Sequence, residues 1–584
     1  MTGDLFYNHA AGRARPVVHD KMKDGFAFLY PPPMSLRCGS GSLDVRSVCY
    51  PLEIFKKYDF LFEHFGVRNR SRGLQVVFQE WPGKSPARVG DPGGEEYAIE
   101  CGPGRVVLSA SSGRAQFYAL STLLQALAFY AADGRMPAFS LRDAPVIAFR
   151  GAFLSGEEAA GSDPSALPRL LLRLALLKFN HLALPAAAGS DPHALASLAR
   201  RTGMALLLLD PDPRSLARLA PTGRRDSASP VGPAVFPEAA AENMNDPAAW
   251  LDFFLAYCRV AAAADGRAVA WGDLFLSHRE WIRRIPRDVL VLNRGAGPGP
   301  GRGDSFQAVA LPFREHQIRQ VLCPHLCAPG RFIPDARAAM ERVDAAMAEV
   351  TARKLAGVLL AAGEGEGCGC LPAGTAMVRF QAGCRLWSGR PPGPAAFSLW
   401  ALGRDEPDLF RIFSFLAQAE HRLSHAHDRY LFEDPLLAPF SRQGDPREIV
   451  AHFRKAALYL KKKEIAANEM TGFLGFTAKL YEAIAAKVQL SSRLPALLET
   501  GSGGEAIRLQ ASGLLQAVME LKGLHAELRG GASPQAGLKE FDMLGERFSQ
   551  LGRAAVSPAA RTALLSALKN PIPLNAAETI PGGP

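Results

Sequence analysis

Short apolar segments alternate with helix-like segments over residues 144–400, and this alternation constrains the fold more than any other feature. The segments IAFRGAFL, NHLALP and MALLLLD are largely apolar, as strands buried on both faces are. Each is followed by a segment such as PSALPRLLLRLALLKF, in which apolar residues recur every three or four positions and predict a helix. About seven or eight such units in about 260 residues favour an α/β fold of the (β/α)8 TIM-barrel type over an open doubly wound sheet.

Two further regions flank this α/β region. Residues 26–143 contain GLQVVFQEW, EEYAIECG and GRVVLSAS, which predict strands, followed by the helical pattern of GRAQFYALSTLLQALAFYAA. They predict a small α+β N-terminal domain. Residues 401–570 are helical in pattern and predict a helical C-terminal domain. Residues 1–25 predict a flexible tail, and residues 571–584 predict a disordered one.

Composition restricts the class of protein and its partners. The chain has 584 residues, of which 48% are hydrophobic and 21% charged, and this balance predicts a folded protein. Its net charge of +10 is spread thinly, with the densest cluster, LKKKE, near Lys461, so we expect no nucleic-acid partner. The first residues show no apolar signal region, and no long apolar run predicts a membrane span. With nine irregularly spaced cysteines, the default expectation is a cytoplasmic protein with reduced thiols.

The order of these regions resembles glycoside hydrolase family 20, the β-N-acetylhexosaminidases and their relatives. The resemblance lies in EEYAIECGPGRVVLSASSGRAQFYALSTLLQAL, LRDAPVIAFRGAFL, RLALLKFNHLAL and ADGRAVAWGDLFLSHREWIRRIPRDVLVLNRG, and covers residues from about 30 to 400. It implies a carbohydrate ligand that contains N-acetylhexosamine, and no cofactor. In that family an Asp-Glu pair follows the fourth barrel strand. The Glu protonates the leaving oxygen, and the Asp orients the substrate's acetamido group, which acts as the nucleophile.

Two residues match sugar-binding positions of that family, and a third candidate lies beside one of them. Arg150, in the first barrel strand, matches an Arg that holds sugar hydroxyls and is expected to point into the barrel mouth. Trp271, in VAWGDLF, matches a pocket Trp, on which the C–H face of a sugar packs well, and Asp273 follows it closely. Each has a structural alternative: Arg150 paired with a nearby carboxylate, Trp271 as a core aromatic, and Asp273 as a helix cap.

The Asp-Glu pair itself is missing from its expected place. Between MALLLLD and the helix at Trp250, the nearest fit is Pro237-Glu238 in AVFPEAAAEN, which makes Glu238 the candidate general acid. Proline cannot accept a hydrogen bond from an acetamide N–H, and losing a group that orients and stabilises charge costs several powers of ten in rate. Alternatively, Glu238 and Glu242 are ordinary loop and helix-start carboxylates, or Asp210 is the acid.

Other positions also depart from the family's pattern. Ser155 stands where an Asp usually closes the first strand motif, and His181 is followed by apolar residues, which indicate a packed structural histidine. Glu364 and Glu366 lie in the Gly-rich AAGEGEGCGC, which lacks the Trp of relatives. We therefore expect a divergent family 20-like protein that is weak or inactive as a hexosaminidase. The alternatives are a working exo-hydrolase with Glu238 as acid, and a non-catalytic sugar-binding or scaffold module.

Two patterns contain possible metal ligands. His421 and His425 lie one helical turn apart in HRLSHAHD, and thiols and an imidazole occur in CPHLC and CGC. The histidine pair lacks the Glu of metalloproteases, and the cysteine spacing is not CxxC. A solvated helix face and isolated thiols are the better interpretations, so we expect no metal.

Overall fold

The computed structural model describes most of the chain. It describes residues 26–81, 94–154, 166–185, 192–209, 231–236, 247–263, 268–295, 306–328, 330–361, 370–403, 406–421, 427–432, 445–461, 469–500, 503–528 and 538–569. The chain forms two compact units. Unit 1 comprises Met1–Leu326, Ala338–Glu364 and Ala376–Phe410, and unit 2 comprises Cys327–Arg337, Gly365–Thr375 and Arg411–Pro584.

Unit 1 begins with a six-stranded sheet in the order β1-β6-β4-β5-β3-β2. Its elements are β1 (Ser35–Asp44), β2 (Val48–Cys49), α1 (Leu52–Lys57), α2 (Asp59–Phe65), β3 (Leu74–Glu80), β4 (Tyr97–Gly102), β5 (Arg105–Ala110), α3 (Gly113–Tyr130) and β6 (Arg135–Asp143). Neighbours are antiparallel from β1 to β5 and parallel from β5 to β2. The side chain of Ser112 caps α3 by accepting a hydrogen bond from Ala115 N at 3.1 Å. The predicted strands and helix of this region are confirmed.

Eight parallel strands follow and pair in a closed ring, in the order β10-β11-β12-β13-β14-β7-β8-β9. The strands are β7 (Phe149–Phe153), β8 (His181–Pro185), β9 (Ala205–Leu209), β10 (Val231–Phe236), β11 (Val269–Trp271), β12 (Leu290–Arg294), β13 (Arg319–Cys323) and β14 (Gly357–Ala361). The helices between and after them are α5 (Ala166–Leu176), α6 (Pro192–Thr202), α9 (Pro247–Ala263), α10 (Asp273–Ser277), α11 (Phe306–Glu315), α12 (Ala336–Arg353), α13 (Pro372–Ser388) and α14 (Pro394–Leu402). The prediction of a mixed α/β fold with a parallel sheet is confirmed.

Alternate residues of the parallel strands fill the interior of the ring, because successive side chains of a strand point to opposite faces. On β7, Phe149 and Phe153 belong to the buried interior cluster. On β12, Leu290 and Leu292 belong to it. The other members are Ala183, Leu207, Val269, Trp271, Val321, Cys323 and Leu359. The residue between two interior residues of a strand, such as Arg150, therefore faces outward, toward the surrounding elements.

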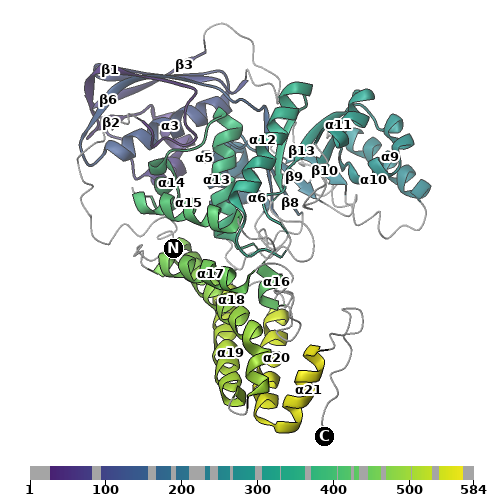
Figure 1. Cartoon of the computed structure of the whole chain (residues 1–584). Helices are drawn as coiled ribbons and strands as arrows, with labels where there is room; N and C mark the ends of the chain where they lie inside the picture. Colours follow the sequence, from purple (N-terminus) through teal and green to yellow (C-terminus); the bar gives the residue numbers. More distant parts are fainter. Residues whose placement is uncertain are drawn as a thin grey trace. The chain divides into compact units, whose positions relative to one another are not determined.

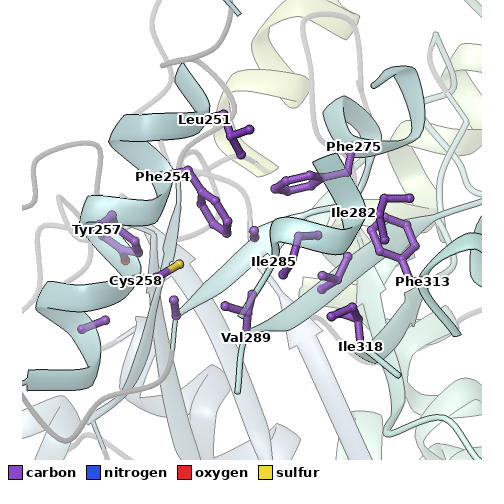
Figure 2. Packing of buried hydrophobic residues seen from close by; sticks show 14 of the residues in the cluster. Leu251, Phe254, Tyr257, Cys258, Phe275, Ile282, Ile285, Val289, Phe313 and Ile318 are labelled. Carbon is purple, nitrogen blue, oxygen red and sulfur yellow. The ribbon is translucent and has the colours of Figure 1, made fainter. Parts of the chain in front are cut away.

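A second apolar cluster covers the outer face of β11 and β12. Figure 2 shows side chains from α9, α10, α11 and the intervening segment packed together, among them Phe254, Phe275, Ile282 and Phe313. The segment HREWIRRIP contains the 3-10 helix η2 (Arg279–Arg284). Apolar side chains on both faces of these strands explain their almost unbroken apolar sequence.

The C-terminal helices are α15 (Pro407–His421), α16 (His427–Phe432), α17 (Pro446–Lys461), α18 (Glu469–Glu499), α19 (Gly503–Leu528), α20 (Leu538–Val556) and α21 (Pro558–Lys569). The C-terminal helices of unit 2 are drawn green to yellow in Figure 1. Within this unit, the ring of Phe332 lies within 6.0 Å of the rings of Phe476, Phe541 and His525, measured between centroids. The predicted helical pattern is observed here. No helix in the described ranges is long and apolar enough to cross a membrane.

Candidate ligand site at the barrel mouth

A tryptophan, an arginine and an aspartate meet where β11 and β12 end. Trp271 is the last residue of β11, and Arg294 is the last residue of β12. The Arg294 Cζ atom lies 3.9 Å from the centroid of the Trp271 ring, and its Nε lies 3.8 Å from Oδ2 of Asp273. In α/β folds built on a parallel sheet, ligands bind at the carboxyl ends of the strands. The structure therefore brings an indole, a guanidinium and a carboxylate together at the end of the barrel suited to binding.

The strand register places the guanidinium above the indole. Trp271 pairs with Leu292, so Arg294 lies two residues closer to the carboxyl end of the sheet. Across the interior, the Trp271 ring makes an edge contact with Phe153 at a centroid distance of 6.0 Å. Trp271 is only 8% exposed as a result. Its environment is that of the core-aromatic alternative.

Asp273 occupies the first turn of α10. The N-cap residue of that short helix is Gly272, and no side chain caps it, so the helix-cap alternative for Asp273 is wrong. The side chain of Asp273 is 41% exposed and that of Arg294 is 20% exposed. Both therefore reach solvent, whereas the indole beneath them barely does.

Arg150 does not enter the barrel mouth, which corrects the predicted orientation. Its side chain is 1% exposed and leaves the outer face of β7. Its guanidinium donates four hydrogen bonds, to the backbone oxygens of Ile147, Ala148 and Lys178 and to Oε2 of Glu95 at 2.7 Å. The physical reason is the alternation of β7, because Phe149 faces the interior and its neighbour must face outward. The alternative of an arginine paired with a structural carboxylate describes what is observed.

Glu95 is the centre of this buried polar network. It precedes β4, and its Oε1 accepts hydrogen bonds from Arg114 at 3.0 Å and Asn180 at 3.1 Å. Asn180 in turn accepts a hydrogen bond from the backbone N of Arg150 at 2.8 Å. The Arg150 guanidinium also lies 4.9 Å from the centroid of Trp387. The network connects the six-stranded sheet, α3 and the start of two barrel strands.

A second buried ion pair lies beside the first. Lys178 Nζ lies 2.8 Å from Oδ2 of Asp143 and 2.6 Å from the hydroxyl of Tyr97. The same Asp143 oxygen accepts a hydrogen bond from the indole of Trp387 at 2.8 Å. Burial lowers the pKa of Lys178, and the carboxylate of Asp143 opposes that shift. These groups are enclosed, so they stabilise the joint between sheet and barrel and do not form a ligand site.

His181 is a packed structural histidine, as predicted. Its ring stacks on Phe149 with centroids 3.7 Å apart, and its Nδ1 lies 2.7 Å from Oδ1 of Asn180. Burial, with the positive charges of Arg114 and Arg150, holds the pKa of His181 well below its usual range. The folded protein therefore keeps this imidazole neutral at mildly acidic pH.

This shift predicts a pH dependence of stability. Below about pH 6.5 the unfolded chain protonates His181 and the folded chain does not, so the free energy of unfolding falls as pH falls. One such group contributes a slope of about 1.4 kcal/mol per pH unit. In His181→Gln, the slope between pH 6.5 and pH 5 is expected to be smaller by about that amount, as measured by urea unfolding. Equal slopes in the two proteins would contradict the neutral buried imidazole.

Several predicted site residues lie outside the described residues. They are Glu238, Pro237, Glu242, Asp210, Ser155, Glu364 and Glu366. His425 and Cys368 of the two possible metal patterns also lie there. Of the described partners, His421 Nδ1 lies 3.3 Å from Oδ2 of Asp335, and Cys327 Sγ lies 3.7 Å from Oγ1 of Thr375. Among the residues that the structure describes, no three His, Cys, Asp or Glu side chains form a group able to hold a metal ion.

Sequence reasoning overlooked Arg294 and Glu95. Arg294 had a local signal, because Leu290, Leu292 and Arg294 alternate along DVLVLNRG and therefore share the interior face of the strand. Arg294 is the third of these interior positions, so it lies at the carboxyl end of β12. Glu95 had no such signal, because its partner Arg150 lies 55 residues away in sequence.

Comparison with known proteins gives structural neighbours only. No family model matches the sequence, and no curated protein matches it. The solved structures similar to this chain include a β-N-acetylglucosaminidase, a chitobiase and an N-acetyl-β-hexosaminidase. The exo-β-N-acetylglucosaminidase of glycoside hydrolase family 20 from Vibrio harveyi, in complex with N-acetylglucosamine, is 12% identical, with 68% of this chain and 78% of that chain covered and a TM-score of 0.41.

The second is a chitobiase from Flavobacterium johnsoniae, 13% identical, with 92% and 95% of the two chains covered and a TM-score of 0.45. The third is the Streptomyces plicatus N-acetyl-β-hexosaminidase, 16% identical, with 65% and 96% covered and a TM-score of 0.45. The structural neighbours of this chain thus include members of glycoside hydrolase family 20.

Proposed function

We propose that this chain is a divergent, glycoside hydrolase family 20-like carbohydrate-binding protein with little or no β-N-acetylhexosaminidase turnover. Its eight-stranded ring is assigned to the (β/α)8 TIM type, and its ligand binds at the carboxyl ends of β11 and β12. The observation that carries the proposal is the cluster of Trp271, Arg294 and Asp273 at that end. An aromatic side chain with flanking polar groups is typical of sugar recognition.

The contacts within this cluster are one reason to expect little or no hexosaminidase turnover. The indole face that a sugar would pack on is covered by a guanidinium 3.9 Å from the ring centroid. Arg150, which matches the family's sugar-binding Arg, donates its hydrogen bonds to Glu95 and to backbone oxygens outside the barrel interior. Both side chains that the resemblance assigns to the sugar are thus engaged in internal contacts.

The sequence gives an independent reason to expect low turnover. Glu238 is the proposed general acid, and it protonates the leaving oxygen of a bound N-acetylhexosaminide. Pro237 stands where the resemblance expects the Asp that orients the acetamido nucleophile. Without that carboxylate, the attack of the acetamido oxygen on the anomeric carbon lacks both its alignment and the stabilisation of its positive charge.

Turnover of 4-nitrophenyl N-acetyl-β-glucosaminide tests this proposal. We expect a kcat about 10³-fold or more below that of a family 20 enzyme with an intact Asp-Glu pair assayed alongside, because two or more stabilising contacts are missing. Any residual turnover is expected to disappear in Glu238→Gln and to rise about tenfold in Pro237→Asp. Turnover equal to that of the intact enzyme would contradict the proposal and favour the working exo-hydrolase.

Binding is tested separately from turnover. Isothermal titration calorimetry with N-acetylglucosamine, its anionic derivatives and chitobiose is expected to show saturable binding of at least one of them. A Trp271→Ala variant is expected to weaken it about tenfold or more, since the ring that lies beneath the Arg294 guanidinium is lost. Absence of binding by every sugar would favour a scaffold role.

A further inference from the structure

We propose that the outer face of the six-stranded sheet in unit 1 binds an acidic polysaccharide in which carboxylate-bearing sugars alternate with neutral ones. This face contains no residue of the barrel strands, so the inference goes beyond the proposed function. Helix α3 contacts β4, β5 and β6 and packs on the opposite face, where Ile99, Leu108 and Leu141 are buried. The outer face is therefore the side of the sheet that a large ligand reaches.

The residues on the outer face are mostly polar and exposed. Successive side chains of a strand point to opposite faces, so the residues between the buried ones point outward. Across the sheet these are Arg37 on β1, Ser140 and Arg142 on β6, Ala98 and Glu100 on β4, Arg105, Val107 and Ser109 on β5, and Gln75, Val77 and Gln79 on β3. Hydroxyl, amide and guanidinium groups at this density suit a hydroxyl-rich polymer better than an apolar partner.

An indole and a guanidinium meet above the middle of this face. Trp81 follows β3 and Arg142 lies on β6, so three strand spacings, about 14 Å, separate their backbones. The Arg142 Cζ nevertheless lies 5.9 Å from the centroid of the Trp81 ring, so the two side chains extend toward each other across β4 and β5. An aromatic ring beside a fork of hydrogen-bond donors is a typical arrangement for sugar recognition.

Small side chains on the two central strands make room for this contact. Arg142 pairs with Ala98, and Ala98 pairs with Ser109 on the next strand. Ala98 is only 6% exposed although its neighbours on this face, Arg142 and Glu100, are exposed. The indole and the guanidinium therefore lie along the sheet over these small residues, where a polymer that runs across the strands contacts both.

The charged groups of the face are sparse and make no ion pairs. Among the residues that the structure describes, Arg37, Arg105 and Arg142 have no ion-pair partner. The same holds for Glu100 and for Glu96, which lies just before β4. Three guanidiniums and two carboxylates give the face a net charge of +1. All five groups are thus available to a ligand.

This charge pattern selects the polymer. A chain with a charge on every unit, such as a nucleic acid, brings anions against Glu96 and Glu100, and like charges in contact are costly. A polysaccharide with one carboxylate in every two sugars presents carboxylates to the arginines, which bind them bidentately. Its neutral sugars present hydroxyl donors to the two glutamates and a C–H face to the indole.

Calorimetry on the full chain tests the inference with hyaluronan and chitin oligosaccharides of equal length, in about 0.15 M salt. Hyaluronan carries a carboxylate on alternate sugars, whereas chitin carries none. We expect hyaluronan to bind about tenfold or more tightly than chitin, because charge-assisted hydrogen bonds are the stronger kind. Heparin and a single-stranded DNA oligonucleotide serve as densely charged polymers and are expected to bind more weakly than hyaluronan.

Variants assign the binding to the face. Arg142→Met is expected to weaken hyaluronan binding about tenfold, and Trp81→Ala is expected to weaken the binding of both oligosaccharides. Glu100→Gln is expected to strengthen hyaluronan binding about threefold, because a repelling charge is removed. The matched control is Arg314→Met, which removes an exposed arginine of α11 and is expected to change nothing. Thermal melting checks that each variant is folded.

Trp271→Ala separates this site from the barrel mouth. It is expected to leave hyaluronan affinity within about threefold, and Arg142→Met is expected to leave N-acetylglucosamine binding unchanged. If hyaluronan affinity falls in Trp271→Ala and not in Arg142→Met, the polymer binds at the barrel mouth, so the sheet site fails and the proposed function stands. If hyaluronan binds through Arg142 and Trp81 while no monosaccharide binds, the sheet site stands without the proposed function.

Three further results would overturn the inference. The first is chitin that binds as tightly as hyaluronan, and the second is heparin or DNA that binds more tightly than hyaluronan. The third is a dimer of the full chain, measured by light scattering, that dissociates in Arg142→Met, because the face would then be an interface between two copies.

Discussion

Arg150→Met is expected to lower the free energy of unfolding by about 3–5 kcal/mol, the usual cost of removing one partner of a buried ion pair. The guanidinium is 1% exposed, and its loss leaves Glu95 and three backbone oxygens each without one donor. Methionine fills much of the same space, so the loss is chiefly electrostatic. Urea unfolding followed by circular dichroism measures it.

Arg46→Met is the matched control, because Arg46 pairs with Asp44 at 3.8 Å with both side chains well exposed. Its effect on stability is expected to be close to zero, as for most surface ion pairs. If Arg150→Met were as stable as the unmutated protein but lost sugar binding, Arg150 would be a ligand residue and the assignment of a structural role would be wrong. Retained sugar binding by the folded fraction is the expected result.

Gly357→Ala is expected to lower the free energy of unfolding by about 3 kcal/mol. A Cβ at this position would lie 2.1 Å from the backbone oxygen of Phe149, and the glycine has a φ of +156°, which side-chain-bearing residues rarely adopt. Gly357 pairs with Phe149 where β14 joins β7, so the clash cannot be relieved without separating two barrel strands. The midpoint of urea unfolding reports the change.

Gly113→Ala controls for the substitution itself. Gly113 begins α3, has no atom within 4 Å of its Cβ position, and does not have a positive φ. Its stability is expected to be unchanged or raised by up to about 1 kcal/mol, since alanine is the better helix former. A Gly357→Ala protein as stable as Gly113→Ala would show that β14 and β7 are not held together as described.

Local patterns predicted the type of most elements in unit 1. The strands β7, β8 and β9 fall within the segments IAFRGAFL, NHLALP and MALLLLD, which were expected to be strands. In the ring, β10 (Val231–Phe236) was not recognised, because its VGPAVF contains Gly and Pro, which interrupt the apolar pattern. In the six-stranded sheet, β1 and β2 were not recognised. β6 was not recognised as a separate strand either, since RMPAFSLRD mixes polar residues with apolar ones.

The types of side chain at the candidate site were predicted correctly, but two of the three residues were not. A guanidinium, an indole and an acidic group were expected together, with Arg150, Trp271 and Glu238 as the three. The structure brings together Arg294, Trp271 and Asp273 instead, while Glu238 lies outside the described residues. The match of Arg150 to a family position suggested a side-chain direction that the alternation of its own strand opposes.

The sequence by itself determined the alternation of strands and helices, the apolar interior and the absence of an Asp-Glu dipeptide after MALLLLD. These follow from residue type and spacing, which act over a few neighbouring positions. Only the tertiary structure decided that Arg150 pairs with Glu95 and that Arg294 covers Trp271. Such contacts join residues far apart in the chain, and a charged side chain takes whichever partner the packing brings within reach once water is excluded.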